Sequence, residues 1–214
     1  MLPAGSDAAR TPAVRRFLAI IVLSMLALIQ SCSEQKPDHA FGLELRKPSS
    51  WTFVSGGVGA ARGDVISYSP AAVTQAIASR SAAPLFALLK QPPPQVGMNP
   101  SLGINLNRAA SIRGQSPISL LEAEVTRARD SGQFQITAPV TASTLAGREA
   151  AQAELRTAAD KPTGNPAVRV RLHLVTVDDV SLLIAATDAV AGVHAASAEF
   201  TQILATLQLT VTPR

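Results

Sequence analysis

The stretch VRVRLHL, residues 168–174, has the strictest alternation of apolar and polar side chains in the whole sequence. Successive side chains of a β-strand point to opposite faces of a sheet, so this pattern predicts a strand. Its aliphatic residues would lie on a packed face. Arg169, Arg171 and His173 would lie together on the other face. The stretch therefore predicts a sheet with one apolar and one basic surface.

The segments that flank this strand are expected to be its neighbours in the sheet. Residues 148–157 also alternate, and if they pair antiparallel with the basic strand, Glu154 lies opposite Arg171. Such opposite charges contribute about 0.2–1 kcal/mol. On the other side, Asp178-Asp179 predicts a hairpin turn, because Asp tolerates the backbone angles of tight turns. Residues 181–186 are apolar throughout, apart from Ser181, and predict a central strand that is buried on both faces.

Helical spacing marks three further segments. Residues 70–80 predict a short helix. A clearer helix begins at Ser116-Pro117, since Ser caps free N–H groups and Pro suits the first turn, and it ends at Gly132. Its apolar stripe is Ile118, Leu121, Val125 and Ala128. We expect a closing helix to cover the sheet, with His194 facing solvent. Its apolar stripe is Val193, Ala196, Phe200, Ile203, Leu204 and Leu207.

The first half of the chain predicts short elements separated by loops. Residues 41–45 and 51–55 read as strands. The glycine-rich residues 55–63 miss the spacing of a dinucleotide-binding loop and predict a hairpin loop. Three consecutive prolines within residues 91–100 predict an extended loop, either a connector or a contact surface.

The amino-terminal residues resemble an export leader. Residues 17–29 carry no charge, but as a helix they would be only about 20 Å long, against a hydrocarbon core of about 30 Å. Arg10, Arg15 and Arg16 precede them, as in the positively charged start of a secretory signal. The pattern predicts a cleaved signal peptide.

This leader closes on Ile29-Gln30-Ser31-Cys32, which resembles the lipobox of bacterial lipoproteins, although Gln30 is larger than is usual there. In such proteins the cysteine carries several acyl chains, and a second chain makes membrane attachment durable. The alternatives are a buried thiol or an unmodified signal-peptide residue. Cys32 is the only cysteine, which excludes an intramolecular disulfide.

The resulting organisation has three parts. We expect a lipoprotein signal peptide over residues 1–31, a lipidated cysteine and tether over residues 32–40, and one domain over residues 41–214. Ser33 stands where an inner-membrane retention signal has Asp, so resemblance to that sorting rule favours the outer membrane, with the domain facing the periplasm. The protein would contact the membrane through the lipid on Cys32.

The net charge of the mature chain argues against nucleic-acid binding. The whole chain carries +4, and the leader holds three Arg and one Asp, which leaves +2 for the mature protein. Nucleic-acid-binding proteins normally cluster Lys and Arg and often add aromatic stacking surfaces. Aromatic residues are only 4% of this chain, so its core should consist mainly of aliphatic residues and alanine.

The sequence contains no recognisable catalytic motif. The sequence has no Gly-x-Ser-x-Gly elbow, no His-Glu-x-x-His pair and no Walker loop. The adjacent Asp178 and Asp179 have no supporting cluster of metal ligands. We therefore expect no enzyme, no metal and no cofactor, although residues distant in sequence can assemble a triad in space.

Two interpretations fit the basic face of the strand at residues 168–174. Arg169, Arg171 and His173 either form a solvated surface that Glu154 partly neutralises, or bind phosphate or carboxylate groups of lipid or cell wall. Both stay open at the level of sequence.

The order of elements resembles one known group. A Pro-x-x-Trp strand entrance (Pro48 to Trp51), a helix over residues 116–130, a strand leading into residues 145–150, a hairpin and a closing helix are similar to the PsbP-like group of extrinsic photosystem subunits and bacterial envelope lipoproteins. The resemblance covers most of residues 41–214. It implies an α+β fold with an antiparallel sheet packed between helices, an αβα sandwich, and a buried Trp51. It transfers no functional residues, because the group shares a fold without a common active site.

The function expected from these features is that of an exported, lipid-anchored envelope protein that acts as a non-catalytic binding or assembly module. Its partner would be an envelope protein or a lipid or cell-wall anion. The alternatives are a carrier for a small apolar ligand and a hydrolase with an unrecognised site. A carrier should contain a sizeable apolar cavity, and a hydrolase should bring a histidine and a nucleophile together in a cleft.

Overall fold

The structure is a computed structural model that describes six stretches of the chain. They are residues 39–55, 60–79, 84–92, 98–157, 167–190 and 196–213. The expected leader, Cys32, most of the tether, the centre of the proline loop, the turn at 161–166, Val193 and His194 lie outside the described residues.

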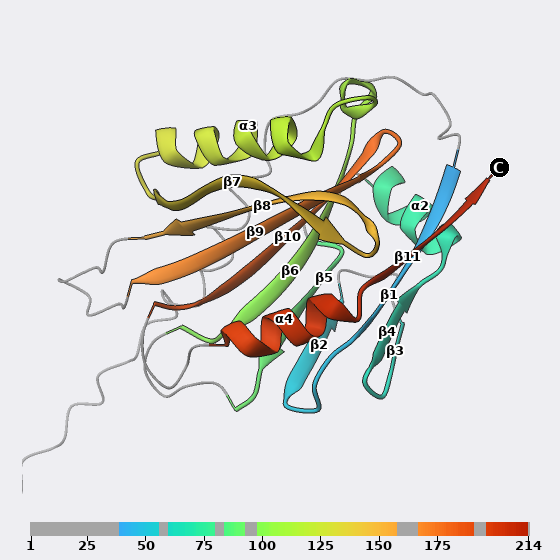
Figure 1. The fold of residues 1–214 in the computed structure, drawn as a ribbon. Helices are drawn as coiled ribbons and strands as arrows, with labels where there is room; N and C mark the ends of the chain where they lie inside the picture. The colour runs from blue at the N-terminus through green and yellow to red at the C-terminus, as the bar shows by residue number, and fades with distance from the viewer. Residues whose placement is uncertain are drawn as a thin grey trace, which may run out of the picture.

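Strands in the described residues form two antiparallel sheets (Figure 1). The larger sheet consists, in spatial order, of β2 (Trp51–Ser55), β5 (Phe86–Lys90), β6 (Ser101–Arg108), β10 (Val180–Ala189), β9 (Val168–Val177), β8 (Arg148–Arg156) and β7 (Gln135–Leu145). The smaller sheet consists of β11 (Gln208–Pro213), β1 (His39–Arg46), β4 (Val65–Tyr68) and β3 (Ala60–Arg62).

The predicted centre of the larger sheet is confirmed. The basic strand is β9, which pairs with β8 in the register that sets Glu154 opposite Arg171. A turn at Asp178 and Asp179 joins β9 to β10, and Asp178 has a left-handed φ of 53°. The apolar strand β10 is the fourth of the seven strands, and its alternate side chains pack into two different cores. Its continuous apolar run thus follows from burial on both faces.

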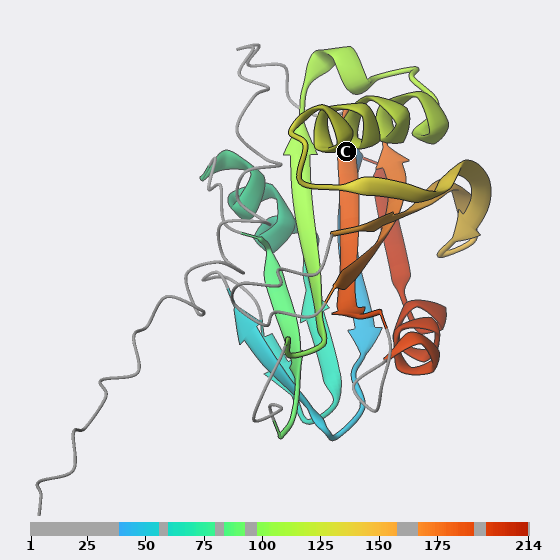
Figure 2. The ribbon, with the colours of Figure 1, turned by 90° about the vertical axis from the view of Figure 1, so that its left-hand side faces the viewer.

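One core lies beneath the helix α3 (Pro117–Asp130), which covers β7, β8 and β9 (Figure 2). Ser116 caps this helix by accepting a hydrogen bond from the backbone N–H of Ser119 at 3.1 Å. The predicted stripe faces the sheet, with Leu121 fully buried against Leu155 and Leu172. The helix expected at residues 116–130 is therefore confirmed together with its buried face.

The second core lies on the opposite face of the larger sheet. The helices α2 (Pro70–Ala78) and α4 (Ser197–Ala205) and the smaller sheet cover this face. Trp51, predicted to be a core residue, is 1% exposed here. Helices thus pack on both sides of an antiparallel sheet, which confirms the predicted α+β fold class.

Two predictions of local structure were wrong. The chain does not close with a helix through Leu207, because α4 ends at Ala205 and the chain returns as β11 beside β1. Residues 207–212 alternate apolar and polar side chains, and two Thr and a Val favour an extended backbone. The end of the glycine-rich segment is also not a loop, because it forms β3, which pairs with an unpredicted strand, β4.

Candidate functional site

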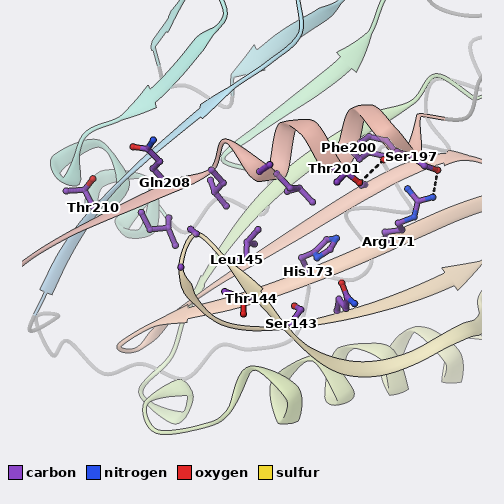
Figure 3. Close-up of a pocket in the computed structure, with 18 residues that line it drawn as sticks. Ser143, Thr144, Leu145, Arg171, His173, Ser197, Phe200, Thr201, Gln208 and Thr210 are labelled. Carbon is purple, nitrogen blue, oxygen red and sulfur yellow. Dashed lines mark hydrogen bonds between the residues drawn. The ribbon is translucent and has the colours of Figure 1, made fainter.

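An open cleft of about 890 Å³ lies between α4 and the tip of the β7–β8 hairpin (Figure 3). Residues 143–147 of the hairpin form one wall, and α4 forms the opposite wall. Gln152, Arg171 and His173 form the floor, and residues 207–210 at the start of β11 close one end. We call this feature the α4 cleft.

The shape of the hairpin wall follows from its turn. Ala146 and Gly147 have φ angles of 52° and 71°, so both adopt the left-handed backbone of a type I′ turn. This turn matches the twist of the flanking strands and needs only the two central residues. Leu145, immediately before the turn, is 7% exposed and packs into the core beneath α4. The wall is therefore held in place by packing at its tip.

The basic residues of the cleft floor share one face of β9 because polar and apolar side chains alternate along this strand. Arg169, Arg171 and His173 share one face of the strand, as the sequence predicted, but the structure divides their roles. Arg171 and His173 line the α4 cleft, whereas Arg169 does not. Both arginine side chains are half-buried rather than solvated, at 20% exposure for Arg169 and 21% for Arg171.

Arg169 holds α4 against the sheet. Its guanidinium makes two hydrogen bonds of 3.0 Å to the carboxylate of Asp188, which is fully buried. The same carboxylate accepts the backbone N–H of Ala196, at the start of α4, at 2.9 Å. The hydrogen bond to Asp188 raises the pKa of Arg169 above its ordinary value. An anion at a helix amino terminus is also favourable, so this cluster fixes the position of α4.

Arg171 is held more loosely. Its Nε lies 3.3 Å from an oxygen of Glu154, whose side chain is 31% exposed. One of its terminal nitrogens donates to the hydroxyl of Ser197, as Figure 3 shows. A guanidinium has more N–H donors than these two contacts use. Within the described residues, Arg171 thus keeps donors that can face the cleft.

His173 lies beside Arg171 on the cleft floor. Burial lowers its pKa below the ordinary value of 6.5, and the positive charge of Arg171 lowers it further. The side chain is therefore neutral at pH 7. Gln152 lies opposite His173 on β8, and the residues of α4 and the hairpin that line the cleft are uncharged. Among the lining residues, only Arg171 and His173 can carry charge.

The lowered pKa of His173 predicts a pH-dependent stability. Below pH 6.5 the unfolded chain binds a proton before the folded chain does, so this residue's contribution is complete above pH 6.5 and is lost as the pH falls towards its folded pKa. The slope attributable to one proton is at most about 1.4 kcal/mol per pH unit. We expect urea unfolding from pH 7.5 to 5 to show this loss, and His173→Gln to reduce it. An equally steep loss in the variant would contradict the assignment.

The cleft does not show the arrangement of a nucleophilic enzyme. Ser197 and His173 both line it, but no hydrogen bond joins them in the described part of the chain. The Ser197 hydroxyl instead accepts from Arg169, at 2.8 Å, and from Arg171. Activation of a serine needs a base within hydrogen-bond reach, and here guanidinium groups occupy that place. Over the described ranges, no group of three His, Cys, Asp or Glu residues is placed to bind a metal.

Sequence reasoning missed two members of this site. Asp188 stands near the end of a strand whose other residues are apolar except for Ser181 and Thr187, and a carboxylate in such a strand is itself a signal of a nearby cation. Ser197 gave no signal, because its role depends on how α4 docks onto β9. No helix in the described segments is both long and apolar enough to cross a membrane.

Comparison with known proteins supports the fold. No family model matches the chain, and a search of curated proteins finds no match. The crystal structure of LpqN from Mycobacterium tuberculosis, a protein involved in cell envelope biogenesis, has a TM-score of 0.52 and 12% identity, over 83% of this chain and 87% of that one. Cyanobacterial PsbP (CyanoP) from Synechocystis sp. PCC 6803 also matches, with a TM-score of 0.46 and 11% identity, over 84% and 98% of the two chains. At this identity the likeness to LpqN is one of fold alone, and it agrees with the α+β fold class that the sequence predicts.

Proposed function

We propose that this chain is an exported lipoprotein and that its α+β domain, residues 41–214, is a non-catalytic binding module of the bacterial cell envelope. Lipid on Cys32 would attach it to the outer membrane, with the domain facing the periplasm. The observation that carries the binding role is the α4 cleft, whose floor presents two basic side chains but no paired nucleophile and base. The involvement of LpqN, a protein of similar fold, in cell envelope biogenesis agrees with this location.

The construction of the cleft suits binding. Its floor is a strand of a seven-stranded sheet, and α4 is fixed by the Arg169–Asp188 pair. Polar groups on regular elements are held in position before a ligand arrives, which reduces the entropy lost on binding. The volume of about 890 Å³ lies within the range of small-molecule sites.

The alternative of a carrier for a small apolar ligand is favoured by one observation. Leu145, Phe200, Leu204 and Leu207 contribute apolar surface to the cleft. A wholly apolar ligand, however, would remove Arg171 from water without replacing its hydrogen bonds, and burying an unpaired charge is costly. The cleft is also open, unlike an enclosed apolar cavity. We therefore favour a ligand or partner with polar groups.

The anchor is tested by membrane fractionation. We expect the wild-type protein in the membrane pellet with an acylated amino terminus at Cys32, and Cys32→Ala in the soluble fraction or unprocessed. Ser33→Ala is the matched control and should behave like the wild type. Mass spectrometry of the mature amino terminus identifies the lipid. An unacylated terminus, or a Cys32→Ala protein that is processed and pelleted as before, would overturn the anchoring proposal.

The assembly role is tested by affinity capture of the tethered protein from detergent-solubilised membranes after crosslinking. A binding module should recover a specific envelope component, and Arg171→Gln should recover less of it if the α4 cleft is the contact site. Recovery of no specific component by the wild type, with or without crosslinking, would count against assembly.

A further inference from the structure

Arg171 is the one lining residue of the α4 cleft that is charged at pH 7, and its charge is positive. Of its lining residues, Arg171 and His173 are basic and none is acidic. Arg171 forms an ion pair with Glu154, which is not one of the residues that line the cleft. Glu154 also accepts a hydrogen bond of 3.1 Å from the Thr137 hydroxyl. Glu154 is thus held towards β7, and the cleft side of Arg171 is left without a carboxylate.

Arg171 and Arg169 differ in how fully their donors are used. Arg169 makes two bonds to Asp188 and a third to Ser197, all in a half-buried setting. Arg171 has single contacts to Glu154 and Ser197. A bidentate bond to a carboxylate or phosphate is the strongest arrangement open to a guanidinium. Arg169 has it already, and Arg171 does not.

Ser197 adds a further donor beside Arg171. Its oxygen accepts a guanidinium N–H from Arg169 and another from Arg171, so both acceptor positions are used. The hydroxyl proton of Ser197 is then left to donate. Figure 3 shows Ser197 and Arg171 together at one end of the cleft, with His173 farther along the floor. This end presents several donors without a carboxylate among the lining residues.

Apart from His173, the remainder of the cleft is lined by uncharged side chains, in which leucines stand among polar residues such as Thr144, Gln208 and Thr210. Leu145 lies on the hairpin wall, Phe200 and Leu204 lie on α4, and Leu207 and Leu209 lie at the start of β11. Leu204 and Leu209 are half-buried, so both keep surface that a ligand can cover. Donors at one end and leucine side chains at the other fit a molecule with an anionic head and an aliphatic chain.

We propose that the α4 cleft binds a single-chain anionic amphiphile, with its phosphate or carboxylate head on Arg171 and Ser197 beside His173 and its chain along Leu145, Leu204 and Leu209. This assignment rests on the proposed binding function and adds the chemical class of the ligand. The cleft volume of about 890 Å³ accommodates one head and one short chain. Arg169 is not part of the ligand contact, because it does not line the cleft and its guanidinium is already paired with the buried carboxylate of Asp188.

The test uses the full lipidated protein in phosphatidylcholine nanodiscs and isothermal titration with soluble short-chain probes. We expect octyl phosphate or octanoate to bind. Octyl glucoside, which lacks the anionic head, and inorganic phosphate, which lacks the chain, should each bind at least about tenfold more weakly. Comparison of octyl phosphate with octanoate identifies which head group is preferred. Equal affinity for octyl glucoside would overturn the anionic head, and equal affinity for inorganic phosphate would overturn the chain.

Variants locate the binding site. Arg171→Gln should weaken octyl phosphate binding about tenfold or more, and Leu204→Ala by about threefold to tenfold. Arg129→Gln removes the same charge from α3, where the side chain is 56% exposed, and should bind like the wild type. Thermal melts confirm that each variant is folded. An Arg171→Gln protein that is folded and binds normally would overturn the site. If the wild-type protein is anchored through Cys32 but does not bind the probes, this inference alone is overturned. If the wild-type protein is not anchored, the proposed function is overturned.

Discussion

Replacing Asp188 with alanine is expected to lower the free energy of unfolding by about 3–5 kcal/mol. The carboxylate is fully buried and accepts two N–H groups of Arg169 and the backbone N–H of Ala196. Its removal leaves a half-buried guanidinium without its anion and the backbone N–H of Ala196, at the start of α4, without its acceptor. Urea unfolding followed by far-ultraviolet circular dichroism measures the loss.

Two further variants separate this cause from a general effect of lost charge. Asp130→Ala removes a carboxylate that is 61% exposed on α3 and should cost no more than about 1 kcal/mol. Arg169→Met combined with Asp188→Leu removes both buried charges and should recover much of the lost stability. If Asp188→Ala and Asp130→Ala cost the same, the buried pair does not hold α4 as described.

Trp51→Ala should have a similar effect, a loss of about 3–5 kcal/mol in the free energy of unfolding. The indole is 1% exposed and packs edge-on against Phe200, with ring centroids 5.5 Å apart. Its N–H donates to Glu199 at 3.0 Å, and Glu199 also pairs with Lys90 at 2.8 Å. The variant therefore opens a cavity beneath α4 and removes a hydrogen bond there.

The matched control for Trp51 lies on the same strand. Val54 is 47% exposed on β2, and Val54→Ala should change stability by less than about 0.5 kcal/mol. Trp51→Phe keeps an aromatic ring and loses the N–H donor, so its cost should fall between the two. Circular dichroism is the suitable probe, because Trp51 is the only tryptophan and its fluorescence disappears in the variant. A small cost for Trp51→Ala would contradict its place in the core.

The parts of the fold that the sequence predicted are those with local signals. Alternation over residues 168–174 predicted both the strand and its two faces. An antiparallel pairing with residues 148–157 was expected to set Glu154 opposite Arg171, and the observed register confirms this. Ser116 and Pro117 identified the start of α3, because capping is a property of a few consecutive residues.

The parts that it missed depend on distant partners. Leu207 fits the helical spacing of α4, yet the chain there becomes β11 because β1, far away in the sequence, provides an edge to pair with. Arg169 and Arg171 are equivalent by alternation, and only the docking of Asp188 and α4 separates a structural arginine from one that faces the cleft. Tertiary contacts of this kind produce no regular spacing of residue types from which they could be predicted.

The pairing of β1 with β11 also affects when the smaller sheet can be completed. A ribosome produces β1 early and β11 last among the described strands, so Phe41 and Leu43 must wait for Val211 and Leu209 to arrive beside them. Domains tend to fold as whole units during synthesis, and this one lacks a closing strand until nearly all of it has emerged. If the chain is exported as proposed above, this order of synthesis keeps the domain from completing its fold before it reaches a translocation channel, which admits only an extended chain.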